Sequence, residues 1–304
     1  MNVIIAPISI LILEEEVAKL NDENLLVTRG QFDVFFARTN QIKNILLEIG
    51  RLRETTFRAI GEGTGKSLDI DKFDDYYYNL FIWDRVNKKI VGGYRLGMGQ
   101  EIFSRQSLEP KKNRINLFYI HSLFKIEQPF FPILKQSIEL GRSYIVPSYQ
   151  NEYLPFFLLW RGILTILTRH PEYKYLIGPV SISKYYSGVS KSLIIEFVKR
   201  NFFDKTIAQY FTPRTPFQSD LEKGNLEEML NTIGGERLKD LENFLSSIEP
   251  EHIKVPVLLK QYTKLNAKFI SFNIDPNFSD ALDGLMLLDL KNLPKEIIQL
   301  LNEK

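Results

Sequence analysis

Cysteine is absent from the 304-residue chain, and histidine occurs only three times, at His121, His170 and His252. Without cysteine there is no disulfide framework, no cysteine-ligated zinc site and no thiol nucleophile. No two histidines lie close together in the sequence, so neither a histidine metal site nor a serine–histidine triad is favoured. The sequence therefore predicts no metal site.

A strong excess of charge and a long hydrophobic run are missing too. The formal net charge is +2, which excludes a strongly basic nucleic-acid binder by total charge. The most apolar stretch, Tyr153–Thr168, is shorter than the ~20 residues of a membrane span and contains Arg161. The apolar segment Val3–Leu13 lacks a basic start and runs into three glutamates, so it is a poor signal peptide, and we expect a buried strand or a tucked-in terminus. These features predict a cytoplasmic protein, with at most peripheral contact with the inner face of the membrane.

Several enzyme signatures are also absent. The chain contains neither the phosphate-binding pattern GxxxxGK(S/T), nor the dinucleotide pattern GxGxxG, nor the nucleophile pattern GxSxG. The His-x4-Asp motif of membrane glycerol-phosphate acyltransferases is missing as well. Any catalytic site must therefore be built from other polar residues.

The spacing of apolar residues predicts alternating strands and helices. The expected strands are 32–37, 80–84, 90–98, 137–146, 173–182, 268–274 and 285–290, and the expected helices are 41–60, 154–168, 189–203, 236–248, 257–265 and a short one after Pro294. This order predicts an α/β fold with a largely continuous sheet. We expect residues 25–214 to form the core and residues 215–304 to form a C-terminal extension packed on it.

Charge is unevenly placed along the chain. Segments 85–114 and 161–214 each carry a net charge of +6, whereas segment 215–304 carries −5. Lys111, Lys112 and Arg114 form one basic group, the 111–114 cluster, and Lys191 and Lys199 share one face of an expected helix. One interpretation is a solvated surface. The other is a docking surface for acyl carrier protein or another acidic partner, or for anionic lipid.

Charged residues also occur inside apolar strands. Arg95 follows Val91-Gly92-Gly93-Tyr94, and Glu139 and Arg142 lie in the segment 138–145. In a regular strand Glu139 and Arg142 point to opposite faces, although Gly141 between them is a natural place for a bulge. A buried charge needs a partner, so these residues indicate either a polar site or an edge strand with solvated charges.

Five motifs in order resemble one family. They are Arg53-x3-Phe57, Asp71-Lys72-Phe73-Asp74, Val91-Gly92-Gly93-Tyr94-Arg95-Leu96, Glu139-Leu140-Gly141-Arg142-Ser143 and Leu159-Trp160-Arg161-Gly162. The chain is similar to the GNAT-superfamily amino-acid N-acyltransferases of ornithine-lipid and glycine-lipid biosynthesis, often labelled hemolysins, and more distantly to acyl-homoserine lactone synthases. The resemblance covers roughly residues 49–290. It implies a GNAT-like three-layer fold with a mixed, mostly antiparallel central sheet flanked by helices, plus a C-terminal α+β extension.

The resemblance also implies the substrates: a (3-hydroxy)fatty-acyl thioester and the α-amine of a small amino acid. General acetyltransferases of the superfamily hold the coenzyme A pyrophosphate on a glycine-rich turn at a helix start. The corresponding segment 147–153 contains no glycine. We therefore expect no bound cofactor, and a phosphopantetheine thioester on acyl carrier protein rather than acyl-coenzyme A as the donor. Asn79 stands where the closest family members have histidine, so this position supplies no base.

The chemistry assigns expected roles to these residues. The attacking amine must lose a proton, and Glu139 is the expected base, with an aspartate as the alternative. We expect a backbone N–H near Tyr144 to stabilise the oxyanion, and Arg142 and Arg95 to hold the acceptor carboxylate or to brace Glu139.

The expected catalytic set is Glu139, Arg142 and Tyr144, and the expected substrate-binding set is Arg53, Phe57, Asp71, Asp74, Arg95, Ser143 and Trp160. For the two aspartates the alternative is a capped loop, and for the two aromatic residues it is plain core.

The leading hypothesis is an N-acyltransferase that makes N-acyl amino acids for membrane lipids. A signal synthase of the homoserine-lactone type is an alternative, which the long tail argues against. A non-catalytic membrane-binding or carrier-binding module is another, which the presence of both Glu139 and Arg142 argues against. The amino acid and the acyl length stay open.

Overall fold

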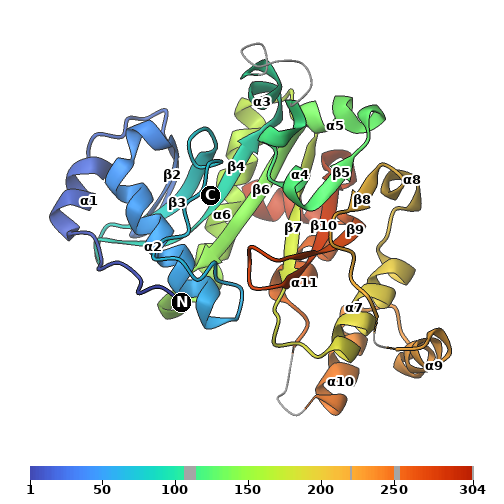
Figure 1. Cartoon of the computed structure of the whole chain (residues 1–304). Helices are drawn as coiled ribbons and strands as arrows, with labels where there is room; N and C mark the ends of the chain where they lie inside the picture. The colour runs from blue at the N-terminus through green and yellow to red at the C-terminus, as the bar shows by residue number, and fades with distance from the viewer. Residues whose placement is uncertain (106–113, 220, 250–253, 303–304) are drawn as a thin grey trace.

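The computed structural model describes residues 1–105, 114–219, 221–249 and 254–302. One eight-stranded sheet runs through the whole molecule in the order β1-β2-β3-β4-β6-β7-β10-β9 (Figure 1). Its strands are β1 Leu25–Arg29, β2 Phe32–Arg38, β3 Tyr78–Asp84, β4 Lys89–Met98, β6 Ser137–Ile145, β7 Tyr175–Ile182, β9 Lys268–Asp275 and β10 Ala281–Asp289. Neighbouring strands are antiparallel except β6 and β7, which are parallel. A separate two-stranded sheet pairs β5 (Phe124–Ile126) with β8 (Phe211–Pro213).

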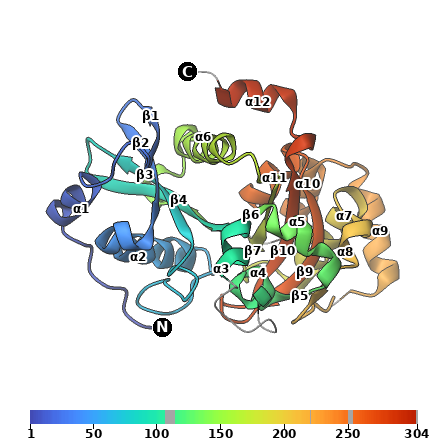
Figure 2. The ribbon, with the colours of Figure 1, turned by 90° about the horizontal axis from the view of Figure 1, so that it is seen from above.

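Two long helices cover opposite faces of the sheet. The helix α2 (Lys43–Ala59) lies on one side of β3 and β4, and α6 (Tyr153–Arg169) lies on the other (Figure 2). A Cβ atom at Gly162 of α6 would lie 2.9 Å from Leu80 of β3 and 3.0 Å from Val34 of β2, so glycine lets this apolar helix pack close to the sheet. The result is the three-layer α/β arrangement expected from the sequence.

The remaining helices are shorter or lie outside these two layers. They are α1 Ile10–Val17, α3 Gly99–Arg105, α4 Ile120–Leu123, α5 Phe131–Lys135, α7 Gly188–Asn201, α8 Lys205–Ala208, α9 Lys223–Ile233, α10 Leu238–Ile248, α11 Val257–Lys264 and α12 Lys295–Asn302. In Figure 1, α7, α9 and α10 gather at the lower right, below the end of the sheet that holds β9. None of the described helices is both long and apolar enough to cross a membrane.

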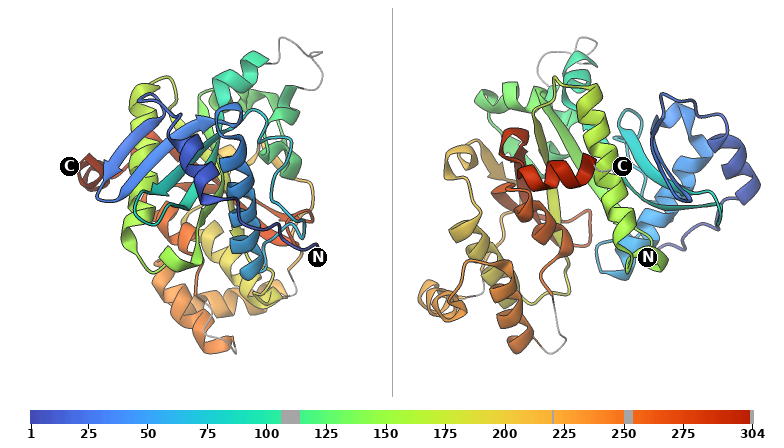
Figure 3. Two further views of the ribbon diagram at one scale, coloured as in Figure 1. Left: turned by 90° about the vertical axis from the view of Figure 1, so that its left-hand side faces the viewer. Right: turned by 180° about the vertical axis from the view of Figure 1, so that it is seen from behind.

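The C-terminal segment is part of the central sheet. The strand β10 pairs antiparallel with β7 over residues 282–289 and with β9 on its other side. The last helix, α12, lies against α6 on the opposite side of the molecule from the viewer of Figure 1 (Figure 3, right). The segment after residue 214, which we expected to pack onto the core, thus continues the sheet itself.

The N-terminal segment differs from the sequence expectation. Val3–Leu13 forms neither a strand nor a buried terminus, because residues 10–17 form α1 and only Leu13 of this helix is buried. Ile10, Leu11 and Ile12 are 52%, 70% and 43% exposed. An apolar run does not by itself specify burial, since much of the surface of a folded protein is apolar.

Candidate active site

The parallel strands β6 and β7 separate part-way along their length. Their pairing comprises three residue pairs and ends at Glu139 and Ile177. Immediately afterwards, a Cβ atom at Gly178 would lie 2.1 Å from the carbonyl oxygen of Leu140, so only glycine fits at this close approach. Beyond this point the two strands leave room between them for other groups.

A bulge in β6 lies at the opening. Gly141 pairs with Arg95 and Tyr144 with Gly93, so two residues of β6, Arg142 and Ser143, oppose one residue of β4. Arg142 has a positive φ of 51°, which a residue with a side chain rarely adopts and which often marks a functional site. The bulge follows Gly141 directly, where the sequence indicated one.

A cavity of about 60 Å³ occupies the opening between the two strands. Strands, loops and α11 all contribute to its wall, whose residues are Phe57, Glu62, Tyr94, Tyr119, Leu140, Gly141, Arg142, Ser143, Pro179, Ser181, Leu258, Tyr262, Phe278 and Asp283. Four of these, from Leu258 onwards, belong to the C-terminal segment. The cavity therefore depends on both parts of the chain.

A continuous chain of ion pairs fixes one wall of the cavity. Its members alternate in charge, in the order Arg53–Asp74–Arg95–Asp71–Arg142–Asp69. Asp74 lies between two guanidinium groups, 2.8 Å from Arg53 Nη1 and 2.9 Å from Arg95 Nη1. Burial alone would raise the pKa of Asp74, but the charges of Arg95 and Arg53 hold it well below its usual value. The acids come from the loop between α2 and β3, so the network ties this loop to the sheet.

Glu139 is fully buried and its carboxylate is occupied. It accepts hydrogen bonds from the Tyr77 hydroxyl (2.5 Å) and from the backbone N–H groups of Tyr119 (3.1 Å) and Ile120 (2.8 Å). Burial raises the pKa of Glu139 from 4.5 to about 7, although these bonds oppose the rise. Glu139 does not line the cavity. Tyr119, whose backbone N–H donates to the Glu139 carboxylate, does line the cavity.

Two other carboxylates, Glu62 and Asp283, do line the cavity. Glu62 is 8% exposed and Asp283 is 2% exposed. Burial raises the pKa of Glu62 from 4.5 to about 8, and the negative charge of Asp283 adds to the rise. Burial also raises the pKa of Asp283, from 3.8 to about 7, against the effect of a 2.7 Å hydrogen bond from the Ser181 hydroxyl. A strongly shifted pKa in a cavity is typical of functional groups.

The loop after α2 places Glu62 at the cavity. Gly61 follows the helix in a left-handed conformation (φ 77°), where a Cβ atom would also lie 2.6 Å from the Tyr185 ring. The hydroxyl of Ser183 donates to the carbonyl of Ile60 (2.5 Å), and that of Ser279 donates to the carbonyl of Gly63 (2.6 Å). The loop is thus held by the residue that follows β7 on one side and by the β9–β10 connection on the other.

The sequence of this chain matches known acyltransferases. A family model described as an acetyltransferase (GNAT) domain matches residues 52–160. A glycine N(alpha)-acyltransferase from Phocaeicola vulgatus is 30% identical over 306 residues, which cover 96% of this chain and 90% of the relative. The same enzyme from Bacteroides thetaiotaomicron is 30% identical over 289 residues, covering 91% and 82%. The chain belongs to this family of GNAT N-acyltransferases.

Among solved structures, the loading GNATL domain of CurA from Lyngbya majuscula matches 86% of this chain and 99% of its own at 13% identity. The TM-score is 0.38. The GNAT fold and acyltransferase activity expected from the sequence are confirmed by the family match and the curated relatives.

The residues predicted for the acyltransferase site fall into three groups. Phe57, Arg142 and Ser143 line the cavity. Behind this wall lie Arg53, Asp71, Asp74 and Arg95, which belong to the ion-pair network. Glu139, Tyr144 and Trp160 are buried outside it.

The predicted residues outside the cavity pack in the core. Tyr144 contacts Phe57 edge-on, with 6.4 Å between ring centroids, and its hydroxyl has no hydrogen-bond partner in the described structure. Trp160 packs against Tyr262 at 5.9 Å, as plain core. Asn79 accepts a 2.8 Å bond from Arg53, so its role is to hold that guanidinium group.

The predicted carrier-docking residues are only partly described. Lys111 and Lys112 lie outside the described residues, and Arg114 begins a short 3-10 helix, Arg114–Leu117. On α7, Lys199 forms a 2.6 Å ion pair with Glu196, and Lys191 lies 3.5 Å from the carbonyl oxygen of Lys184.

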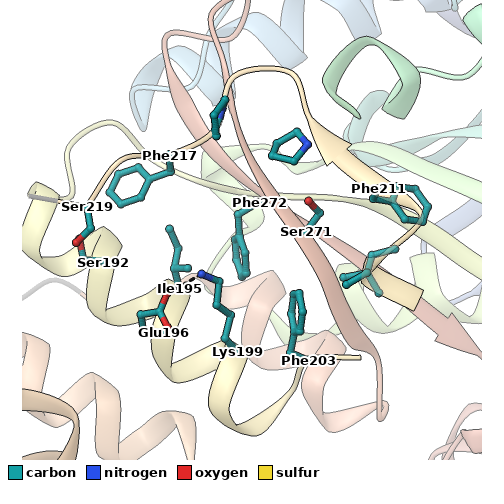
Figure 4. Close-up of a pocket in the computed structure, with 14 residues that line it drawn as sticks. Ser192, Ile195, Glu196, Lys199, Phe203, Phe211, Phe217, Ser219, Ser271 and Phe272 are labelled. Carbon is teal, nitrogen blue, oxygen red and sulfur yellow. Dashed lines mark hydrogen bonds and ion pairs between the residues drawn. The ribbon is translucent and has the colours of Figure 1, made fainter. Parts of the chain in front are cut away.

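Lys199 also borders a groove of about 400 Å³ between α7, β8 and β9, whose labelled aromatic residues, including Phe217 and Phe272, are shown in Figure 4. Among the predicted site residues that the structure describes, no other lines this groove. Within the described residues, no group of three or more histidine or acidic side chains is arranged to hold a metal ion.

Proposed function

We propose that this acyltransferase moves a 3-hydroxyacyl or related fatty-acyl group from acyl carrier protein to the α-amine of glycine. The observation that carries the proposal is the cavity between β6 and β7, whose wall contains one guanidinium group, Arg142, and two carboxylates, Glu62 and Asp283. A zwitterionic amino acid needs groups of both signs. The names of the two curated relatives support glycine as the acceptor.

The size of the cavity supports a small acceptor. Its volume is about 60 Å³, whereas one water molecule takes up roughly 30 Å³ in the liquid. A head group of a few heavy atoms fits this space without large rearrangement. The longer side chain of ornithine needs more space than this cavity provides.

A carrier-bound donor is supported by the start of α6, where general acetyltransferases hold a diphosphate. The segment 147–152 before this helix contains no glycine, and Glu152 occupies the N-cap position without capping the helix through its side chain. A carboxylate at this position opposes the binding of a diphosphate. The basic middle of the chain, including the 111–114 cluster, favours an acidic carrier protein through long-range attraction.

An N-acylated amino acid with a long chain is amphiphilic, so we place the reaction at a membrane surface. The exposed apolar residues Ile10, Leu11 and Ile12 of α1 support peripheral contact with lipid. Liposome flotation of the wild type and of Leu11→Glu checks this part separately. Equal flotation of the two proteins would exclude α1 as the contact.

Purified protein incubated with 3-hydroxyacyl carrier protein and single amino acids tests the reaction directly. We expect mass spectrometry to detect N-acylglycine, with ornithine a poorer acceptor and acyl-coenzyme A a poorer donor. Equal catalytic efficiency with both donors would contradict the carrier preference. Formation of an acyl-homoserine lactone in place of an N-acyl amino acid would favour the signal-synthase alternative.

A further inference from the structure

Among the described residues, Glu62 and Asp283 are the buried acids with the fewest partners. Neither forms an ion pair, and the other buried acids without one, Asp84, Glu139 and Asp275, each accept at least two hydrogen bonds. Asp69 and Asp74 each contact a guanidinium group within 2.9 Å. Within the described part of the chain, Glu62 forms no hydrogen bond or ion pair through its carboxylate, and Asp283 accepts only the Ser181 hydroxyl. A buried carboxylate without a partner is costly, so its presence in the wall of a cavity indicates a ligand that supplies the missing positive charge.

We propose that Glu62 is the catalytic base: it receives the ammonium group of the amino acid in the cavity and takes its proton, with Asp283 sharing the positive charge. This inference rests on the proposed function, because it requires an amine acceptor. Arg142 lines the same cavity and provides the opposite charge for the carboxylate of the amino acid.

The reaction then balances as follows. The ammonium nitrogen loses one proton to the Glu62 carboxylate, and the freed amine attacks the thioester carbonyl carbon to form the C–N bond. The C–S bond breaks, and the departing thiolate takes the second proton from nitrogen. The products are an amide and a thiol, and Glu62 later releases its proton to water. A base works best when its pKa lies near the working pH, as the raised pKa values of Glu62 and Asp283 provide.

Glu139 is placed differently. Its oxygens accept three hydrogen bonds from protein groups, and it is absent from the cavity wall. We therefore infer that Glu139 is a positioning residue. It fixes the backbone of Tyr119, whose ring lies 4.8 Å from the Arg142 guanidinium carbon.

The test compares Glu62→Gln with Glu139→Gln in the full chain, using acyl carrier protein and glycine as substrates. We expect Glu62→Gln to lower kcat by at least about 100-fold, the lower end of general-base contributions. We expect Glu62→Asp to recover part of this rate. In Glu139→Gln we expect a lower melting temperature and a kcat within about tenfold of wild type.

The pH profile of kcat/KM separates a base from a structural residue. In the wild type we expect kcat/KM to rise with pH through apparent pKa values between about 7 and about 8, which belong to the coupled pair Glu62 and Asp283. This rise is the acid limb of the profile. Glu62→Gln should remove this limb, whereas Glu139→Gln should keep it. Asp84→Asn, which replaces a buried carboxylate remote from the cavity, serves as a control and should also keep it. The other ionisable groups around the pair Glu62 and Asp283 are Tyr94, Tyr119, Arg142, Tyr186, Tyr262 and Asp275.

Each outcome has one meaning. If wild type acylates glycine and Glu62→Gln stays within about threefold of it, the inference is wrong while the proposed function stands. If Glu139→Gln rather than Glu62→Gln loses the limb, Glu139 is the base. If wild type acylates no amine with any thioester donor, the proposed function fails and this inference fails with it.

Discussion

Replacing Glu62 by glutamine should stabilise the protein at neutral pH. Glu62 is only 8% exposed, and among the described residues no ion pair offsets the charge of its carboxylate. Its pKa in the folded protein is about 8, against an ordinary value of 4.5. Because ionisation is disfavoured by folding, the folded state must keep a proton that the unfolded state releases. Glutamine has nearly the same shape and removes this linkage.

The magnitude follows from the size of the shift. At pH 7 the unfolded carboxylate has passed its own pKa by 2.5 units (7 − 4.5), and each unit corresponds to ~1.36 kcal/mol. The upper limit is thus about 3 kcal/mol. The glutamine amide also lacks a protein partner, which costs part of the gain, so we expect Glu62→Gln to raise the free energy of unfolding by about 1–3 kcal/mol.

The sign of the pH dependence is a stricter check. Since the folded pKa is raised, the stability contributed by Glu62 is fully present below about pH 4.5 and is lost as the pH rises through about 8. The advantage of Glu62→Gln should therefore be small at about pH 5 and largest at about pH 8. Urea denaturation of both proteins across this range measures it.

Asp84→Asn is a control that should change the stability in the opposite direction. Burial would raise the pKa of Asp84, but hydrogen bonds from Asn87, Tyr149 and Gln31 lower it from 3.8 to about 2. This variant should lose stability at every pH above about 4. A Glu62→Gln protein that is less stable than wild type at about pH 8, or whose difference from wild type does not change with pH, would show that folding does not raise the pKa of Glu62.

Four further predictions concern the same region. Asp74→Asn leaves two buried guanidinium groups without a carboxylate and should cost about 3–5 kcal/mol in urea denaturation; a loss below about 1 kcal/mol would show that the network is not stabilising. Gly178→Ala places a Cβ atom 2.1 Å from a carbonyl oxygen, so we expect a marked fall in melting temperature, and an unchanged melt would contradict the close approach. Ser181→Ala removes the hydrogen bond that favours ionised Asp283 and should move the acid limb of the pH–rate profile to higher pH; a shift to lower pH would contradict this. Reversing the charge of the 111–114 cluster should raise KM for the carrier-bound donor but not for glycine, and equal changes in both would exclude a docking role.

Most of the secondary structure was predictable because its signals are local. The helix expected at 154–168 is α6, Tyr153–Arg169, and the strand expected at 137–146 is β6, Ser137–Ile145. The alternation and spacing of apolar residues determine these elements. The strand β1 and the helix α1 were missed, because β1 carries a mixed five-residue sequence and α1 exposes its apolar side chains.

The cavity was only partly predictable. Arg142 and Ser143 were expected because polar residues interrupt an apolar strand. Asp283 is likewise a polar residue within the apolar segment 281–289, but the sequence does not reveal that β10 pairs with β7. Glu62 follows a helix in a glycine-rich run, which indicates only a break in the helix. Its position depends on a contact between Gly63 and Ser279, 216 residues apart.

Arg142 belongs to the ion-pair network and also lines the cavity that holds the carboxylates of Glu62 and Asp283. Its guanidinium group contacts Asp69 at 2.8 Å and Asp71 at 3.5 Å, so the network fixes its position. Arg142 does lower the pKa of Asp283, but burial and the charge of Asp275 keep that pKa raised. The network thus holds a guanidinium group at the cavity without neutralising the carboxylates there. An incoming ammonium group is then the cation that completes the site, and its binding favours the ionised form of Glu62 that proton transfer requires.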